Sequence, residues 1–111
     1  MISTFQVLWT LPAEQDVHEI IAFIAQENPI AAKKVLDQFK EQAMRLECCP
    51  ERGRVVPELK EQGLLQYREL IISHWRLIYR IHQNQVLVLT VLDARRNVKD
   101  ILLESLLRNE N

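Results

Sequence analysis

The sequence lacks the features that define several large classes of protein. No apolar run approaches the roughly 18 residues that a membrane-spanning helix needs. The N-terminus MISTFQVLWT has no basic residues ahead of an apolar stretch, so it does not resemble a secretory signal peptide. Repeats, low-complexity tracts and linkers are also missing, and 111 residues is a typical length for one compact domain. We therefore expect a single domain over residues 1–111, located in the cytoplasm and not bound to a membrane.

Cysteine and histidine are scarce. The two cysteines, Cys48 and Cys49, are adjacent, and a bridge between neighbours would strain the backbone far from ordinary disulfide geometry. None of the three histidines lies in a metal-ligand pattern. We expect a reduced cysteine pair at a helix end, and neither a metal site nor a cofactor.

Excess charge of one sign is also absent, because the formal net charge is −1. Such a balance argues against a surface built entirely for nucleic acid. The distribution is uneven, however: residues 1–65 contain seven basic and ten acidic residues, whereas residues 66–111 contain seven and five. The C-terminal part is therefore the basic part of the chain.

A strand pattern and two helical patterns occupy the first half of the chain. FQVLW, at residues 5–9, alternates as a strand does, and the following Thr10 and Pro12 suit a helix cap and a first turn. Apolar residues then recur at helical spacing on both sides of Asn28-Pro29, a pair that suits the cap and first position of a second helix. These patterns predict a helical hairpin.

The most informative stretch is residues 67–97, YRELIISHWRLIYRIHQNQVLVLTVLDARRN. The alternation in WRLIYRIH places the aromatic and aliphatic side chains on a core face and Arg76 and Arg80 on the other face. Residues 86–92 are almost continuously apolar, as in a central strand covered on both faces. With a short helix predicted in the tail, the order β-α-α-β-β-β-α predicts an α+β fold. We expect an N-terminal strand, a two-helix antiparallel hairpin, and a curled antiparallel three-stranded sheet.

The turn at Ser73-His74 leaves two strand registers open. If the turn has an even number of residues, Glu69 lies diagonally between Arg76 and Arg80 and partly neutralises them. If the number is odd, Arg68 joins Arg76 and Arg80 on one face, and Glu69 is forced toward the apolar side. The first register keeps the apolar residues together better, whereas the second makes a stronger anion site.

Several short motifs together resemble one protein family. GRVVPEL, YREL, WRLIYRI and LTVLDARRN, in this order after a helical hairpin with ENPIAAKKVL, are similar to the bacterial RelE/ParE superfamily of type II toxins. The resemblance implies a toxin in a hetero-oligomer with a cognate antitoxin, whose acidic C-terminal tail wraps and neutralises it. It also implies one of two targets, because the RelE branch cleaves messenger RNA at the ribosomal A site and the ParE branch inhibits DNA gyrase. The fold does not distinguish these targets.

Similarity to the ribonuclease branch places its catalytic arginines at Arg76 and Arg95, and places Arg68 where that branch has a lysine. A second lysine aligns with Leu70 and a tyrosine with the region of Ile101, and neither side chain transfers protons. The hairpin, the Asn-Pro junction and the VLDARR ending resemble the ParE branch more closely. We therefore expect a protein that binds and inhibits DNA gyrase. The alternatives are a metal-independent, ribosome-dependent messenger RNA endoribonuclease using Arg76 and Arg95, or a non-toxic member that only binds its antitoxin.

Five arginines are expected to contact the target or the antitoxin. They are Arg68, Arg76, Arg80, Arg95 and Arg96. Arg95 and Arg96 follow the end of a buried strand on a short loop, where binding residues tend to gather.

The GRVVPEL segment is expected to have a structural role. Arg54 and Glu58 are predicted to tether this crossing loop to the rest of the protein by hydrogen bonds. Gly53 is predicted to serve the conformation of the backbone.

Overall fold

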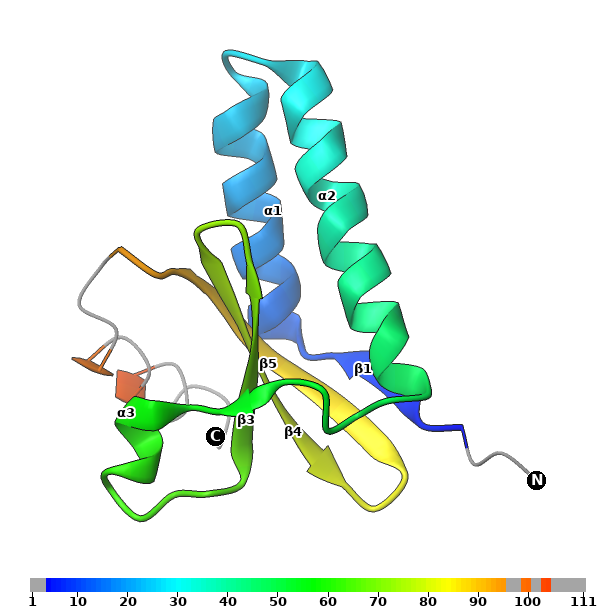
Figure 1. Cartoon of the computed structure of the whole chain (residues 1–111). Helices are drawn as coiled ribbons and strands as arrows, with labels where there is room; N and C mark the ends of the chain where they lie inside the picture. Colours follow the sequence, from blue (N-terminus) through cyan, green and yellow to red (C-terminus); the bar gives the residue numbers. More distant parts are fainter. Residues whose placement is uncertain (1–3, 96–98, 101–102, 105–111) are drawn as a thin grey trace.

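A computed structural model describes residues 4–95, 99–100 and 103–104 (Figure 1). Its elements are β1 (Gln6–Trp9), α1 (Leu11–Ala25), α2 (Pro29–Met44), the 3₁₀ turn η1 (Arg45–Glu47), β2 (Arg54–Val55), α3 (Pro57–Lys60), β3 (Tyr67–Ile72), β4 (Trp75–His82) and β5 (Gln85–Asp93). The predicted α+β class and the order of the long elements are confirmed. The structure adds β2 and α3 within the crossing segment. The predicted C-terminal helix, including Ile101, lies largely outside the described residues.

The two long helices begin where their capping residues predict. The Thr10 hydroxyl accepts a hydrogen bond from the Ala13 backbone N–H (3.4 Å), and the Asn28 side chain accepts one from Ala31 (3.0 Å). Pro29 occupies the first position of α2, where its missing N–H removes no helical hydrogen bond. Within the described residues, no helix is both long enough and apolar enough to cross a membrane.

The sheet has five strands in the order β1-β5-β4-β3-β2. β1 lies parallel to β5, with Gln6 opposite Gln85 and Trp9 opposite Val88, whereas the other neighbours are antiparallel. The predicted antiparallel sheet is thus the larger part of a mixed sheet. The periodicity of β1 could not identify its partner, because the two strands are separated by most of the chain.

The register of β3 and β4 is the first of the two predicted registers. Ile71 pairs with Arg76 across the two-residue turn Ser73-His74, and Ser73 has a left-handed φ of 57°, as tight hairpin turns often require. Glu69 therefore lies on the same face as Arg76. Arg68 pairs with Tyr79 and belongs to the opposite face.

Apolar cores cover both faces of the sheet. On one face, Trp75, Leu77 and Tyr79 pack with Phe39 and other residues of the helical hairpin, which confirms the predicted core side of β4. On the other face, residues of α3 and the nearby loop form a second core with the sheet: Val56, Leu59, Leu64, Tyr67, Ile78, Leu87, Leu89 and Leu92. Figure 1 shows the hairpin and α3 on different sides of the sheet. The arginine face of β4 is consequently buried over part of its length.

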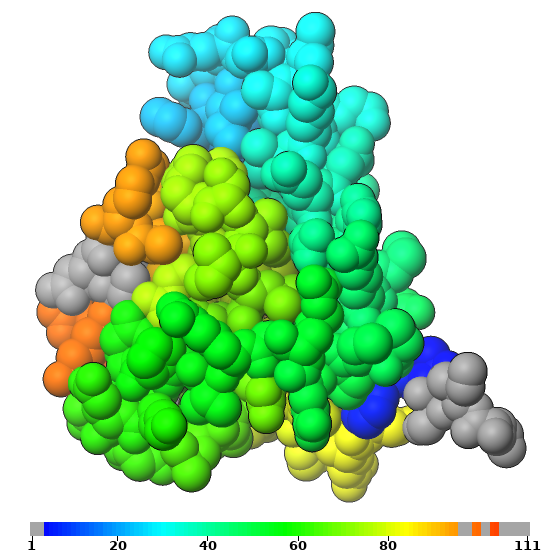
Figure 2. Space-filling model, in the orientation of Figure 1, coloured from blue at the N-terminus to red at the C-terminus, as the bar shows by residue number. Residues whose placement is uncertain are grey.

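The tip of the hairpin projects beyond the sheet (Figure 2). Two large apolar side chains near the tip, Phe23 and Ile30, are 74% and 73% exposed. Other apolar residues of α1, up to Ile24 near its end, pack against the core.

Candidate functional site

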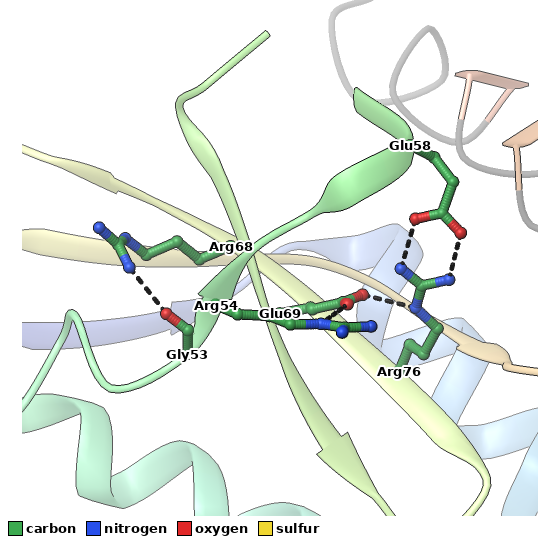
Figure 3. Close-up of polar contacts among 6 residues, drawn as sticks. All are labelled: Gly53, Arg54, Glu58, Arg68, Glu69 and Arg76. Carbon is green, nitrogen blue, oxygen red and sulfur yellow. Dashed lines mark hydrogen bonds and ion pairs between the residues drawn. The ribbon is translucent and has the colours of Figure 1, made fainter. Parts of the chain in front are cut away.

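Four charged side chains form a chain of ion pairs on the α3 face of the sheet, and we call them the Arg76 cluster: Arg54, Glu58, Glu69 and Arg76 (Figure 3). Arg54 Nε donates to Glu69 Oε2 at 2.6 Å, and Arg76 Nε donates to the other oxygen, Oε1. The two Nη atoms of Arg76 donate to the two oxygens of Glu58, each at 2.7 Å. All three guanidinium nitrogens of Arg76 therefore face carboxylates.

Strand register and one turn of helix assemble this cluster. Arg54 on β2 lies directly opposite Glu69 on β3, and the β3–β4 register brings Arg76 onto the same face. Glu58 comes from the first turn of α3, which Pro57 begins. The predicted tethering of the crossing loop by Arg54 and Glu58 is confirmed.

Burial makes the pairing necessary. The side chain of Glu69 is 0% exposed and that of Arg76 is 6% exposed, whereas Glu58 is 28% and Arg54 60% exposed. Removing a charge from water is costly unless a partner and hydrogen bonds compensate for it. The cluster has two positive and two negative groups, and no buried side-chain polar atom in the described residues lacks a partner.

Electrostatics keep both partners of the Glu58–Arg76 pair ionised. The hydrogen bond from Arg76 lowers the pKa of Glu58 below its ordinary value. The same carboxylate is the main reason that the pKa of Arg76 rises above its ordinary value. The guanidinium of Arg76 is thus fixed as the cation of an internal ion pair. Its predicted contact with a phosphate or a partner stays a prediction, and that contact would have to displace a carboxylate.

A second polar network fixes the loop before β2. The Tyr79 hydroxyl donates to the Pro50 carbonyl at 2.7 Å and accepts from the Gly53 N–H at 3.0 Å. Burial raises the pKa of this phenol. A Cβ on Gly53 would lie 2.5 Å from the Glu69 carbonyl oxygen and 2.6 Å from the Tyr79 hydroxyl. A glycine is therefore needed at position 53 because Glu69 and Tyr79 leave no room for a side chain. Its φ is not left-handed, so backbone conformation is not the reason.

Arg68 joins this second network and is separated from Arg76. Its Nη1 donates to the Gly53 carbonyl at 2.7 Å (Figure 3). The same atom donates to the Glu51 carbonyl at 3.3 Å. Because Arg68 and Arg76 lie on opposite faces of the sheet, the structure does not bring them together as one anion site.

Arg80 is half-buried on β4, opposite Tyr67. The expectation that Glu69 partly neutralises both Arg76 and Arg80 is right for Arg76 and wrong for Arg80, because the second oxygen of Glu69 accepts from Arg54. Among the described residues, no carboxylate forms an ion pair with Arg80. This arginine therefore keeps its charge available at the surface of the sheet.

Arg95 lies on the exposed loop after β5. Its Nε donates to Asp93 Oδ1 at 3.0 Å, and its Nη2 donates to Asp93 Oδ2 at 2.7 Å. These hydrogen bonds lower the pKa of Asp93 and raise that of Arg95. The neighbouring Arg96 lies outside the described residues. The contacts of both arginines with a target or an antitoxin stay predictions.

An apolar hollow of about 270 Å³ lies where β1 meets the helical hairpin. Its lining residues are Trp9, Glu14, Val17, Leu36, Phe39 and Lys40. Sequence periodicity predicted the apolar stripes of the helices but not the hollow, which depends on the position of β1 at the sheet edge. In the described part of the chain, no three or more metal-ligating side chains gather in a way that would hold a metal ion.

The helical hairpin, the mixed sheet and the order of elements agree with the fold that the resemblance to the RelE/ParE superfamily of type II toxins implies. The chain belongs to the ParE toxin family of the parDE type II toxin-antitoxin system, whose family model matches residues 7–98. The superfamily resemblance of the sequence motifs is therefore confirmed.

Individual relatives agree with this family. The chain is 27% identical over 94 residues to Toxin ParE3 of Caulobacter vibrioides, a match that covers 84% of this chain and 90% of that toxin. A solved structure of the chromosomal ParDE system from P. aeruginosa has a TM-score of 0.69 at 18% identity, covering 82% of this chain and 97% of the other. The toxin-antitoxin complex RelBE2 from Mycobacterium tuberculosis has a TM-score of 0.57 at 23% identity, covering 84% and 94%. At these identities, the two structures establish the shared fold.

Proposed function

We propose that this toxin acts in the cytoplasm by binding and inhibiting DNA gyrase, and that a cognate antitoxin neutralises it in a hetero-oligomer. Membership of the ParE family supports the toxin role. The observation that favours inhibition by binding over RNA cleavage is the enclosure of Arg76 between Glu58 and Glu69.

Metal-free RNA cleavage requires cations beside the reacting phosphate and groups that transfer protons. The resemblance to the ribonuclease branch would assign the phosphate to Arg76, but this guanidinium already has two carboxylate partners. Removing one partner from a buried ion pair costs about 3–5 kcal/mol, because the other charge is left buried and unpaired. Displacing Glu69 from Arg76 would leave this fully buried carboxylate with Arg54 alone. A phosphate would have to offset that cost before it stabilised any transition state.

Leu70 supports the same conclusion. It aligns with a lysine of the ribonuclease branch, yet here it is buried among the residues that pack against the helical hairpin. An aliphatic side chain in this position neither donates nor accepts a proton. The proposed mechanism is therefore the occupation of a surface on gyrase, with no covalent step by the toxin.

The hollow between β1 and the hairpin is the proposed binding site for the antitoxin. Its lining includes Trp9 and Phe39, which suit apolar side chains of a bound tail. Lys40 also lines the hollow. An acidic tail would pair its carboxylates with Lys40 and with exposed arginines of the basic C-terminal part. Lys40→Glu is expected to weaken antitoxin binding. Lys34→Glu, an exposed position on the same helix that does not line the hollow, is the matched control.

A supercoiling assay with purified toxin and gyrase tests the proposed target. We expect stoichiometric toxin to abolish supercoiling or to trap a cleavage complex, and we expect added antitoxin to restore activity. Normal supercoiling with folded, stoichiometric toxin would reject the proposal. The ribonuclease alternative makes a different prediction, since messenger RNA would be cut at the ribosomal A site after the toxin is induced.

A further inference from the structure

The structure presents two thiols side by side on its surface. Cys48 and Cys49, which are the two cysteines of the sequence, follow η1 and are both exposed. Their Sγ atoms lie 3.2 Å apart. Neither toxin action nor the core explains this pair.

Backbone hydrogen bonds hold the turn that bears the thiols. The N–H of Cys49 donates to the Arg45 carbonyl at 3.2 Å, and the carbonyl of Cys49 accepts from the Arg52 N–H at 3.2 Å. The next residue, Pro50, is fixed by the Tyr79 hydroxyl. The two thiols therefore project from a backbone that other parts of the protein keep in place.

The distance between the sulfurs suits a single bridging atom. It exceeds the roughly 2.05 Å of a disulfide bond. An atom that binds both sulfurs at about 2.3 Å, the length of a zinc–sulfur bond, would enclose an angle of roughly 90°. Such an angle is narrower than the tetrahedral angle of zinc, and zinc would also need further ligands. Among the described residues, no group of three or more ligating side chains supplies them.

We propose that Cys48 and Cys49 chelate a trivalent, monosubstituted arsenical of the form RAs(OH)₂. Pyramidal trivalent arsenic forms bonds at close to a right angle, and two thiols together with its own substituent complete its coordination. In the reaction, two S–H and two As–OH bonds break, two As–S bonds form, and two water molecules leave. Arsenic remains trivalent and sulfur is not oxidised, so no oxidant is required.

Two further properties favour a chelate over oxidation. The hydrogen bond with Cys48 raises the pKa of the Cys49 thiol, which lowers the fraction of thiolate available to oxidants. A direct disulfide between neighbouring residues would also distort the backbone, whereas an inserted atom lengthens the ring and relieves this constraint.

Binding of phenylarsine oxide by the purified full chain tests the proposal. We expect one adduct per protein by intact mass, with loss of both free thiols. The adduct should survive excess glutathione, a monothiol, and be removed by dithiothreitol. Chelation typically strengthens binding by about 100-fold or more over one-point attachment. Cys48→Ser and Cys49→Ser should each therefore bind at least about 100-fold more weakly.

A variant with two separated thiols is the matched control. In Cys48→Ser with Lys33→Cys, the new thiol lies near the start of α2 and Cys49 lies beyond its end, about 16 Å or more along the helix axis. We expect this variant to lose the adduct to glutathione while its thermal unfolding stays close to that of the original chain. Equal retention by this variant, two independent adducts on the original chain, or release of the original adduct by glutathione would each overturn the proposal.

Discussion

Replacement of Arg76 by methionine tests whether this arginine holds the fold together. Arg76→Met leaves Glu69 at 0% side-chain exposure with one remaining partner, Arg54, which is itself 60% exposed. Breaking a buried pair costs about 3–5 kcal/mol. We expect the lower end, about 3 kcal/mol, because Arg54 remains in place and Glu58 can be hydrated.

Thermal and urea unfolding followed by circular dichroism would measure this cost. A domain of about this size loses roughly 4 °C in melting temperature per kcal/mol, which predicts a decrease of roughly 12 °C. Arg80→Met is the matched control, because Arg80 lies on the same strand, is half-buried and has no ion-pair partner among the described residues. Its expected effect is within about 0.5 kcal/mol.

A second variant separates the ion pair from the packing of its side chains. In Arg76→Met with Glu69→Met, both buried charges are removed and replaced by apolar groups, so most of the lost stability should return. A loss of stability in Arg76→Met no larger than that in Arg80→Met would show that the ion pair does not stabilise the fold. A double variant less stable than the sum of the two single changes predicts would show the same.

Three other predictions concern pH, steric fit and the exposed loop. The depressed pKa of Glu58 means that its ion pair stabilises the fold above the unfolded value of about 4.3 and is lost as pH falls through the folded value. Glu58→Gln should thus cost about 1 kcal/mol at pH 7 by urea unfolding, and this difference should vanish in acid. Gly53→Ala should cost about 3 kcal/mol by overpacking. Gly63→Ala, with open space but a φ of 82°, should cost about 1 kcal/mol; equal costs would contradict the close approach at Gly53. Charge reversal at Arg95 and Arg96 should weaken gyrase inhibition in a titration while leaving the melting temperature nearly unchanged, and loss of cooperative unfolding would show that these arginines are structural.

Local sequence patterns predicted a large part of the fold. The caps at Thr10 and Asn28 depend on neighbouring residues, and the alternation of β4 depends on its own side chains, so each could be inferred without knowledge of the rest of the chain. The register of β3 and β4 could also be predicted, because it keeps the apolar residues of both strands on one face. The parallel pairing of β1 with β5 did not follow, since it joins strands from opposite ends of the chain.

The candidate site was harder to predict because its character depends on distant partners. The pattern placed Arg76 on a polar face that looked open to an anion. That face is covered by α3, which is only one turn long. Leu59 and its neighbours are the only apolar residues that could have indicated this helix in the sequence. Glu58 is 18 residues from Arg76 in the sequence, and only the folded crossing segment brings the two together. The motif GRVVPEL indicated that hydrogen bonds hold the crossing loop, but it did not identify Arg76 as the residue to which Glu58 binds.

The most direct test of the central claim uses the variant Arg76→Met with Glu69→Met, which lacks the buried ion pair but is expected to be folded. Its inhibition of gyrase would be titrated beside that of the original chain, after circular dichroism has shown equal folding. We predict the same titration curve for both proteins, because we propose that the Arg76 cluster stabilises the toxin and that inhibition does not depend on its contact with gyrase. Loss of inhibition in the folded variant would contradict this account and would place Arg76 in the binding site.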